Sequence, residues 1–132
     1  ALNYYGHPGV KVLNGGWRLW VSEGRRVDLS RPRAATGTTF TPKVNEAIMC
    51  RLDELKAAYN RPDVVIWDVR SDGEWDGSGG RGNKRQGHVP GAIHLEWFNV
   101  MDRDSHRFKP PQEIRRVLAE VGITPDKTVY SY

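Results

Sequence analysis

The feature that most constrains the fold is a short apolar run at residues 64–67, Val-Val-Ile-Trp, which ends abruptly in charged residues. A strand with one solvated face carries polar residues at alternate positions, and this run carries none. It is therefore predicted to be a strand buried on both faces, as in a parallel sheet covered by helices. Binding sites in such folds lie beyond the carboxyl ends of the strands, which is where Asp68 and Arg70 stand.

Helical periodicity on both sides of this run predicts the covering layers. Apolar residues within 43–60 and within 111–121 recur at steps of three and four, which indicates two amphipathic helices. Gly122 is suited to end the second helix. A shorter helix is predicted near Trp17, with Trp17, Trp20 and Val21 on its core side.

Further short strands and one long loop complete the predicted elements. The strands are expected at residues 10–13, 39–41, 92–97 and 128–132, and the glycine-rich loop at residues 71–91. Strands that alternate with helices imply α/β layers joined by right-handed crossovers.

Composition limits the classes of function. The 132 residues, 38% of them hydrophobic, suit one globular domain or one domain with part of another, and no apolar run is long enough for a membrane span. The net charge of +4 is dispersed, which indicates a solvated surface and small anionic substrates rather than nucleic acid. A single cysteine excludes an internal disulfide and suits a reducing cytoplasm.

Three motifs near the central run resemble those of the rhodanese domain of sulfurtransferases. They are Asp68-Val69-Arg70 at the strand end, Glu74-Trp75-Asp76-Gly77, and His88-Val89-Pro90-Gly91-Ala92 before the strand that ends in Glu96-Trp97. The resemblance implies a rhodanese-like α/β fold, with a parallel sheet and helices on both faces.

A second piece of the same family is expected at the start of the chain, because residues 5–17 resemble the closing strand and last helix of a rhodanese domain. Residues 1–23 are thus expected to be the C-terminal tail of a first domain, residues 24–38 a linker, and residues 39–132 most of a second domain in tandem. By this resemblance the fold is incomplete, because the second domain stops before its active-site loop and closing elements. Residues 1–23 are expected either to fill that gap or to pack as a remnant of a neighbouring domain, and they fill it only if residues 10–13 pair with a strand of residues 39–132.

The catalytic group of the family is a cysteine that carries sulfane sulfur as a persulfide. The resemblance places it directly after Tyr132, so none of the residues present is predicted to be the catalytic nucleophile. Cys50 is predicted to lie in the middle of a helix, where the amides are already hydrogen-bonded and stabilise no thiolate. We therefore expect Cys50 to be a small, partly buried apolar side chain.

Asp68, Arg70 and His88 are the candidate residues for support of the active loop or for substrate binding. Asp68 can accept hydrogen bonds from the backbone of that loop, and Arg70 can pair with an acid or attract an anion. The alternative is a buried charge pair that only holds the loop after the strand. His88 can carry a proton, but a ring that is hydrogen-bonded to the backbone is the favoured interpretation. Glu74 stands where mammalian-type relatives carry a substrate-binding arginine, which points to the bacterial thiosulfate type.

No metal or cofactor is predicted. The spacing of His88, His94 and His106 does not suit zinc, and no cysteine joins them. The glycine-rich residues 77–82 lack the preceding strand and following helix of a phosphate loop.

The function that the resemblance implies is that of a thiosulfate-type sulfurtransferase. Its partners would be a small anionic sulfur donor such as thiosulfate and a thiol or cyanide acceptor, with no nucleic acid and no membrane. The alternative is a non-catalytic binding or regulatory module, or an inactive fragment. A cysteine after Tyr132 favours the enzyme, whereas an aspartate or a gap favours the module.

Overall fold

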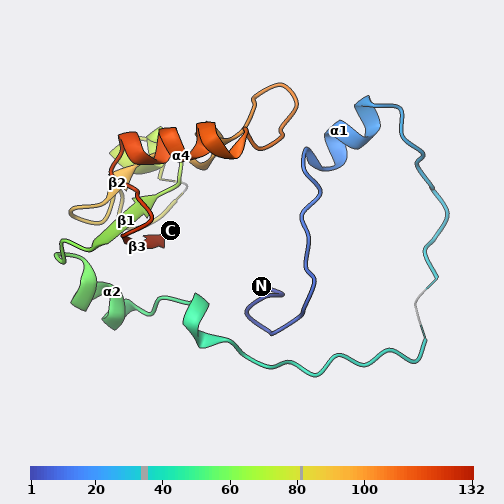
Figure 1. Ribbon diagram of the computed structural model, residues 1–132, viewed down its shortest axis with the longest axis horizontal. Coiled ribbons are helices and arrows are strands. Elements are labelled where there is room, and N and C mark those ends of the chain that lie inside the picture. The colour runs from blue at the N-terminus through green and yellow to red at the C-terminus, as the bar shows by residue number, and fades with distance from the viewer. Residues whose placement is uncertain (34–35, 81) are drawn as a thin grey trace. The chain divides into compact units, whose positions relative to one another are not determined.

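The computed structural model describes residues 1–33, 36–80 and 82–132 of the chain (Figure 1). These residues divide into two compact units, Ala1–Met49 and Cys50–Tyr132. Within the described residues, no helix has the length and apolar character that crossing a bilayer requires.

The second unit is built on a three-stranded parallel sheet. Its central strand is β1 (Val64–Asp68), which pairs with β2 (Ile93–His94) on one side and with β3 (Thr128–Ser131) on the other. Every residue of β1 is buried or half-buried, with Ile66 only 2% exposed, as the unbroken apolar run predicts. The prediction of a parallel α/β sheet is therefore confirmed.

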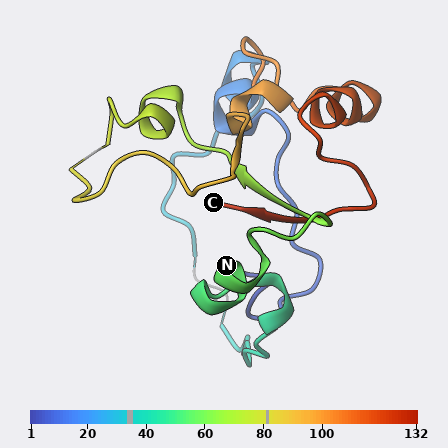
Figure 2. The ribbon, with the colours of Figure 1, turned by 90° about the vertical axis from the view of Figure 1, so that its left-hand side faces the viewer.

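Helices cover both sides of this sheet. In Figures 1 and 2, α4 (Pro111–Glu120) and α2 (Leu52–Ala58) lie on opposite sides of β1 and β3. The predicted core side of α4 is confirmed, because Ile114, Val117 and Leu118 are half-buried while the residues between them are exposed.

Gly122 ends α4 in the left-handed conformation, with a φ of 81°, as the sequence predicts. No atom outside its immediate neighbours lies within 4 Å of the position that a Cβ would take. A side chain at this position would therefore lower stability only through the strained backbone conformation. Gly122→Ala should therefore destabilise the second unit by about 1 kcal/mol in urea unfolding. Gly122→Asn should cost less, since asparagine tolerates this conformation. Equal losses for the two variants would contradict the backbone explanation.

The predicted helix at 43–60 is wrong as a single element. It is divided into a 3₁₀ turn, η1 (Glu46–Ile48), and α2, with Met49 extended between them at φ −117° and ψ 119°. Each piece has its own cap: the Ala47 amide donates to the Asn45 carboxamide at 3.2 Å, and the Arg51 amide donates to the Glu54 carboxylate at 2.7 Å.

The predicted loop at 71–91 also contains a helix, α3 (Asp72–Asp76). The next strand, expected over 92–97, is reduced to β2, and a 3₁₀ turn, η2 (Trp97–Val100), follows it. The glycine-rich part of the loop includes residue 81, which lies outside the described residues.

Among its described residues, the first unit contains one α-helix, α1 (Gly16–Ser22), besides the 3₁₀ turn η1. The strands predicted at 10–13 and 39–41 are absent; instead the Lys43 and Asn45 amides donate to the carbonyls of Tyr5 and Tyr4, at 2.9 and 2.7 Å. Residues 10–13 therefore do not form the predicted strand, and the hypothesis that residues 1–23 fill a gap in the sheet stays a prediction.

The predicted core side of α1 is wrong at two of its three positions. Trp17 and Val21 are 64% and 47% exposed, whereas Trp20 is half-buried and donates from its indole to the Arg26 carbonyl. The predicted linker at 24–38 includes residues 34–35, which lie outside the described residues.

Candidate functional site

The carboxyl edge of the sheet gathers the candidate residues of the second unit. At this edge the Asp68 carbonyl accepts the Leu95 amide at 3.2 Å, and the Val69 amide donates to the Tyr132 carbonyl at 3.1 Å. The backbone around Asp68 is thus hydrogen-bonded to Leu95 on one side and to Tyr132 on the other. The side chain of Asp68 is 0% exposed. A fully buried carboxylate requires a partner.

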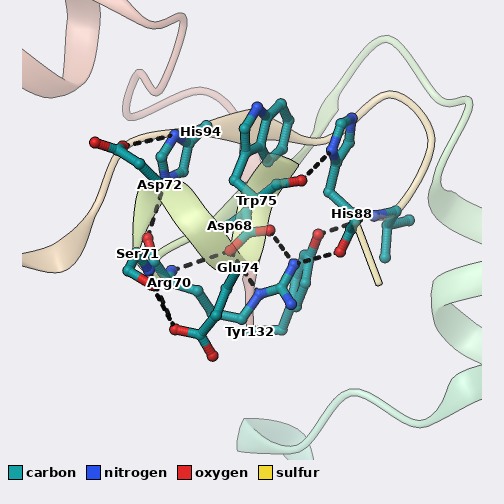
Figure 3. A network of polar contacts seen from close by, with 11 residues as sticks. Asp68, Arg70, Ser71, Asp72, Glu74, Trp75, His88, His94 and Tyr132 are labelled. Atoms are coloured by element: carbon teal, nitrogen blue, oxygen red, sulfur yellow. Dashed lines mark hydrogen bonds and ion pairs between the residues drawn. The ribbon is translucent and has the colours of Figure 1, made fainter. Parts of the chain in front are cut away.

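That partner is Arg70 (Figure 3). Its guanidinium donates to both carboxylate oxygens of Asp68, from Nε at 2.9 Å and from Nη2 at 2.5 Å. The Arg70 amide adds a third bond at 3.0 Å. The bidentate geometry gives Asp68 the strongest kind of hydrogen bonding that a side chain can supply. The charge pair that the alternative interpretation predicts is therefore present, and Arg70 pairs with an acid.

Protonation of the pair follows from these contacts. Burial acts to raise the pKa of Asp68, but the hydrogen bonds from the Arg70 side chain and amide outweigh it, so the pKa lies below its usual value. The same side-chain hydrogen bonding raises the pKa of Arg70. Asp68 is thus a carboxylate and Arg70 a cation throughout the neutral range.

The loop before β2 is attached to this pair. Arg70 Nη2 also donates to the Gly87 carbonyl at 3.0 Å, and the Arg70 guanidinium lies 4.9 Å from the centre of the Tyr132 ring. The Tyr132 hydroxyl accepts the Val89 amide at 3.0 Å, and burial raises the pKa of that hydroxyl. Residues 87–89 are therefore held by the end of β1 and by the residue that follows β3.

The first turn after β1 is fixed by a helix cap. Ser71 precedes α3, and its hydroxyl donates to the Glu74 carboxylate at 2.8 Å, with the Ser71 amide 3.4 Å from the same oxygen. A serine followed three residues later by glutamate is a capping box, a pattern that could have predicted this helix from the sequence. Glu74 is thus engaged by the start of its own helix.

The Glu74 cap yields a measurable expectation. Glu74→Ala should cost about 1 kcal/mol, the usual effect of losing a helix cap, and should speed amide hydrogen exchange in α3. Glu74→Gln keeps an acceptor oxygen at the same place and should cost less than half as much. If Glu74→Ala and Glu74→Gln speed the exchange of α3 equally, an acceptor oxygen at this position does not cap the helix, and the assignment is wrong.

A stack of three aromatic rings lies close to the Asp68–Arg70 pair and consists of His88, Trp75 and His94 (Figure 3). The Trp75 and His88 ring centres lie 3.4 Å apart at 9°, and those of Trp75 and His94 lie 5.0 Å apart at 8°. The His88 ring bonds the Trp75 carbonyl at 2.9 Å, so the favoured interpretation of His88 as bonded to the backbone is confirmed. Neither Trp75 nor His94 was predicted from the sequence to belong to the site.

The remaining candidate nucleophile is Cys50, which lines one cavity together with Tyr132. Cys50 precedes the cap of α2 rather than lying in mid-helix, so its predicted position is wrong, although it is half-buried as expected. Burial, and then the Glu54 charge, raise the pKa of its thiol, which disfavours the thiolate. Among the residues that the structure describes, no group of three His, Cys, Asp or Glu side chains could hold a metal ion.

The sequence predicted Asp68, Arg70 and His88, and the structure brings them together through Gly87. Arg70 binds the Gly87 carbonyl, and His88 is the next residue. The sequence did not predict the role of Tyr132, because no local pattern shows that the end of β3 contacts the loop before β2. The arrangement is a buried ion pair that fixes a loop at the edge where parallel sheets hold their sites.

A parallel sheet with a buried acid–arginine pair at its carboxyl edge agrees with the family comparison. The family model described as "Rhodanese-like domain" matches residues 51–132, and the chain belongs to this family. The matched residues lie wholly within the second unit, Cys50–Tyr132.

Curated relatives match nearly the whole chain. Thiosulfate sulfurtransferase of Pseudomonas aeruginosa is 31% identical over 131 residues, which cover 99% of this chain and 47% of that protein. Thiosulfate sulfurtransferase of Azotobacter vinelandii is 34% identical, again over 99% of this chain and 47% of the relative. The sulfur carrier protein TtuD of Thermus thermophilus is 32% identical over 98% of this chain. The chain therefore spans about half the length of these relatives.

Solved structures show the same fold. Wild-type EanB matches 98% of this chain and 32% of its own, with a TM-score of 0.84 and 28% identity. An anaerobic ergothioneine biosynthesis enzyme from Chlorobium limicola, solved with trimethyl histidine, matches 98% of this chain and 33% of its own, with a TM-score of 0.80 and 27% identity.

Proposed function

We propose that this chain is part of a thiosulfate-type sulfurtransferase, in which a cysteine directly after Tyr132 carries sulfane sulfur as a persulfide. The observation that supports this is the placement of Tyr132. Its amide donates to the Trp67 carbonyl at 3.2 Å, and its carbonyl accepts the Val69 amide, so the residue after Tyr132 would leave the sheet beside Asp68 and Arg70. Parallel α/β proteins place their sites at this edge.

The proposed chemistry has two steps. The cysteine thiolate attacks the outer sulfur of thiosulfate, the S–S bond breaks, and sulfite leaves with the electron pair. Cyanide or a thiolate then attacks the outer sulfur of the persulfide and regenerates the cysteine thiolate. In this scheme Asp68, Arg70 and His88 support the loop that holds the cysteine.

The arrangement around the site fits a supporting role for Arg70. Its guanidinium already binds both oxygens of Asp68 and the Gly87 carbonyl, and its side chain is 25% exposed. A residue this engaged fixes the loop and contributes positive charge, while direct contact with thiosulfate is left to other groups. We further propose that residues 1–23 end a preceding rhodanese domain and that the protein works in the reducing cytoplasm, where the thiol of its nucleophile stays reduced.

The experiment begins with the natural full-length polypeptide. Its intact mass and the residue after Tyr132 are determined first. Thiocyanate formation from thiosulfate and cyanide is then measured, and the protein is examined for a mass gain of one sulfur atom after thiosulfate treatment. Replacing the cysteine by serine should abolish both signals, while Cys50→Ser should leave both unchanged.

The opposite results define the alternative function. An aspartate or a gap after Tyr132, or a protein that takes up no sulfur from thiosulfate, would overturn the proposal. The chain would then be a non-catalytic rhodanese-like binding or regulatory module. Loss of sulfur uptake in Cys50→Ser would instead move the nucleophile to Cys50.

A further inference from the structure

We propose that Trp75 is a positioning residue for Arg70, which it holds through the ring stack with His88 and His94. Figure 3 shows the three rings side by side above the Asp68–Arg70 pair. This role rests on the proposed function for its effect on the reaction, and on geometry alone for its effect on the loop.

Arg70 is held at two points by the segments that carry the two histidines. Its backbone carbonyl accepts a hydrogen bond from His94 Nε2 at 2.9 Å. Its guanidinium donates to the carbonyl of Gly87, the residue before His88. The position of the Arg70 side chain therefore depends on how His88 and His94 are placed relative to each other.

Trp75 sets that relative placement. Its indole lies between the two imidazoles, nearly parallel to both, at 3.4 Å from His88 and 5.0 Å from His94. Both histidines bond backbone carbonyls, so the bonding nitrogens are donors: Nδ1 of His88 toward Trp75 and Nε2 of His94 toward Arg70. These bonds fix the plane of each ring and so keep the rings in register with the indole.

The contacts form a closed circuit. The chain runs from Asp68 through the Ser71–Glu74 cap to Trp75, across the stack to His88, and back through Gly87 to the Arg70 guanidinium. Residues joined in a closed loop of contacts have less freedom to move than the same residues joined in an open chain. Removal of the indole leaves the hydrogen bond from His88 to the backbone carbonyl at position 75 and the Asp68–Arg70 pair in place, but it removes the stacking that fixes the His88 ring against α3.

Four variants of the full-length protein test this role. Trp75→Leu removes the central ring, and Trp75→Phe keeps a smaller one. His94→Gln loses the stacked ring but keeps an N–H donor for the Arg70 carbonyl. Trp17→Leu is the matched control, because Trp17 is 64% exposed and lies in the first unit. Each is measured by amide hydrogen exchange of residues 86–92 and by kcat and KM for thiosulfate, well below the thermal midpoint of the weakest variant.

The proposal expects a specific pattern. Trp75→Leu should speed exchange of the Val89 amide, which bonds the Tyr132 hydroxyl, and should lower kcat by about 10- to 100-fold with little change in KM, as small misplacements do. Trp75→Phe should recover most of the wild-type kcat and most of the protection of the Val89 amide. For both quantities, His94→Gln should fall between the two Trp75 variants, and Trp17→Leu should match the wild type.

Two results would overturn the proposal. One is unchanged exchange of residues 86–92 in Trp75→Leu; the other is a raised KM with unchanged kcat, which would make the stack part of substrate binding. If the wild type transfers no sulfur, the proposed function fails. The exchange measurement then decides alone whether Trp75 holds the loop that carries Gly87.

Discussion

Arg70→Met is expected to destabilise the second unit by about 3 kcal/mol, because it leaves a buried carboxylate without its cation. Asp68 is 0% exposed, and two of its hydrogen bonds come from the guanidinium that methionine lacks. The loss should lie at the lower end of the range for a broken buried pair, since Arg70 itself is 25% exposed. Urea unfolding, monitored by amide exchange of β1, measures it.

The dependence on pH separates this explanation from simple loss of packing. In the wild type the pKa of Asp68 is lowered, so its contribution is present at neutral pH and is lost as the pH falls below about 4. In Arg70→Met the guanidinium bonds are lost, and burial should outweigh the remaining hydrogen bonds from the position-70 amide and Tyr132, so the pKa of Asp68 should rise above its ordinary value. Acidification then relieves the buried charge, so the difference between variant and wild type should shrink as the pH is lowered.

The chain contains a closely matched control for this variant. Arg61 and Asp63 form the same Arg–Asp pair two residues apart, also with two hydrogen bonds, but their side chains are 59% and 51% exposed. Arg61→Met should therefore change stability little and show no comparable effect of pH. If Arg61→Met and Arg70→Met cost the same, burial of Asp68 is not what makes Arg70 important.

Ile66→Ala is expected to cost about 3 kcal/mol, within the usual range for truncating a buried aliphatic side chain. Ile66 is 2% exposed in the central strand and lines a cavity with Leu52, Leu55 and Tyr130, so its truncation would enlarge space that is already empty. Urea unfolding of the full chain measures the loss. Activity of the surviving folded protein should change far less than in Arg70 variants.

A control on the same sheet is Val129→Ala. Val129 pairs with Val65 of β1 but is 36% exposed, so its truncation should cost well under half as much. Similar losses for Ile66→Ala and Val129→Ala would show that the interior of the sheet is not centred on β1.

The elements that the sequence predicted well are those whose pattern is set by burial. The run at 64–67 became β1, the periodic residues of 111–121 became α4, and Gly122 ended that helix as expected. In each case a packed surface and a local pattern demand the same conformation, so the pattern is a reliable guide.

The predictions failed where local caps decide. The spacing of apolar residues over 43–60 favoured one helix, yet the caps at Asn45 and Glu54 divide it. In α3, five residues with a glycine among them have little helical propensity, and the Ser71–Glu74 pair stabilises the turn instead.

The site was predicted in part for a similar reason. Asp68 and Arg70 could be found from their place after a strand, whereas the stack of Trp75 with two histidines joins residues far apart in the sequence and depends on how the loop returns. Spacing along the chain carries no information about such ring contacts.

The order of the strands also governs how the sheet is assembled. β1 is synthesised before either of the strands that pair with it. Because Val64 pairs with Thr128, β1 cannot complete its pairing until residues much later in the chain have been synthesised. Contacts between such distant segments slow the search for the native state, because long loops must close before the strands gain their bonds. Until β3 arrives, β1 has an open, apolar edge. The nascent protein should therefore depend on chaperones most during synthesis of residues 64–128.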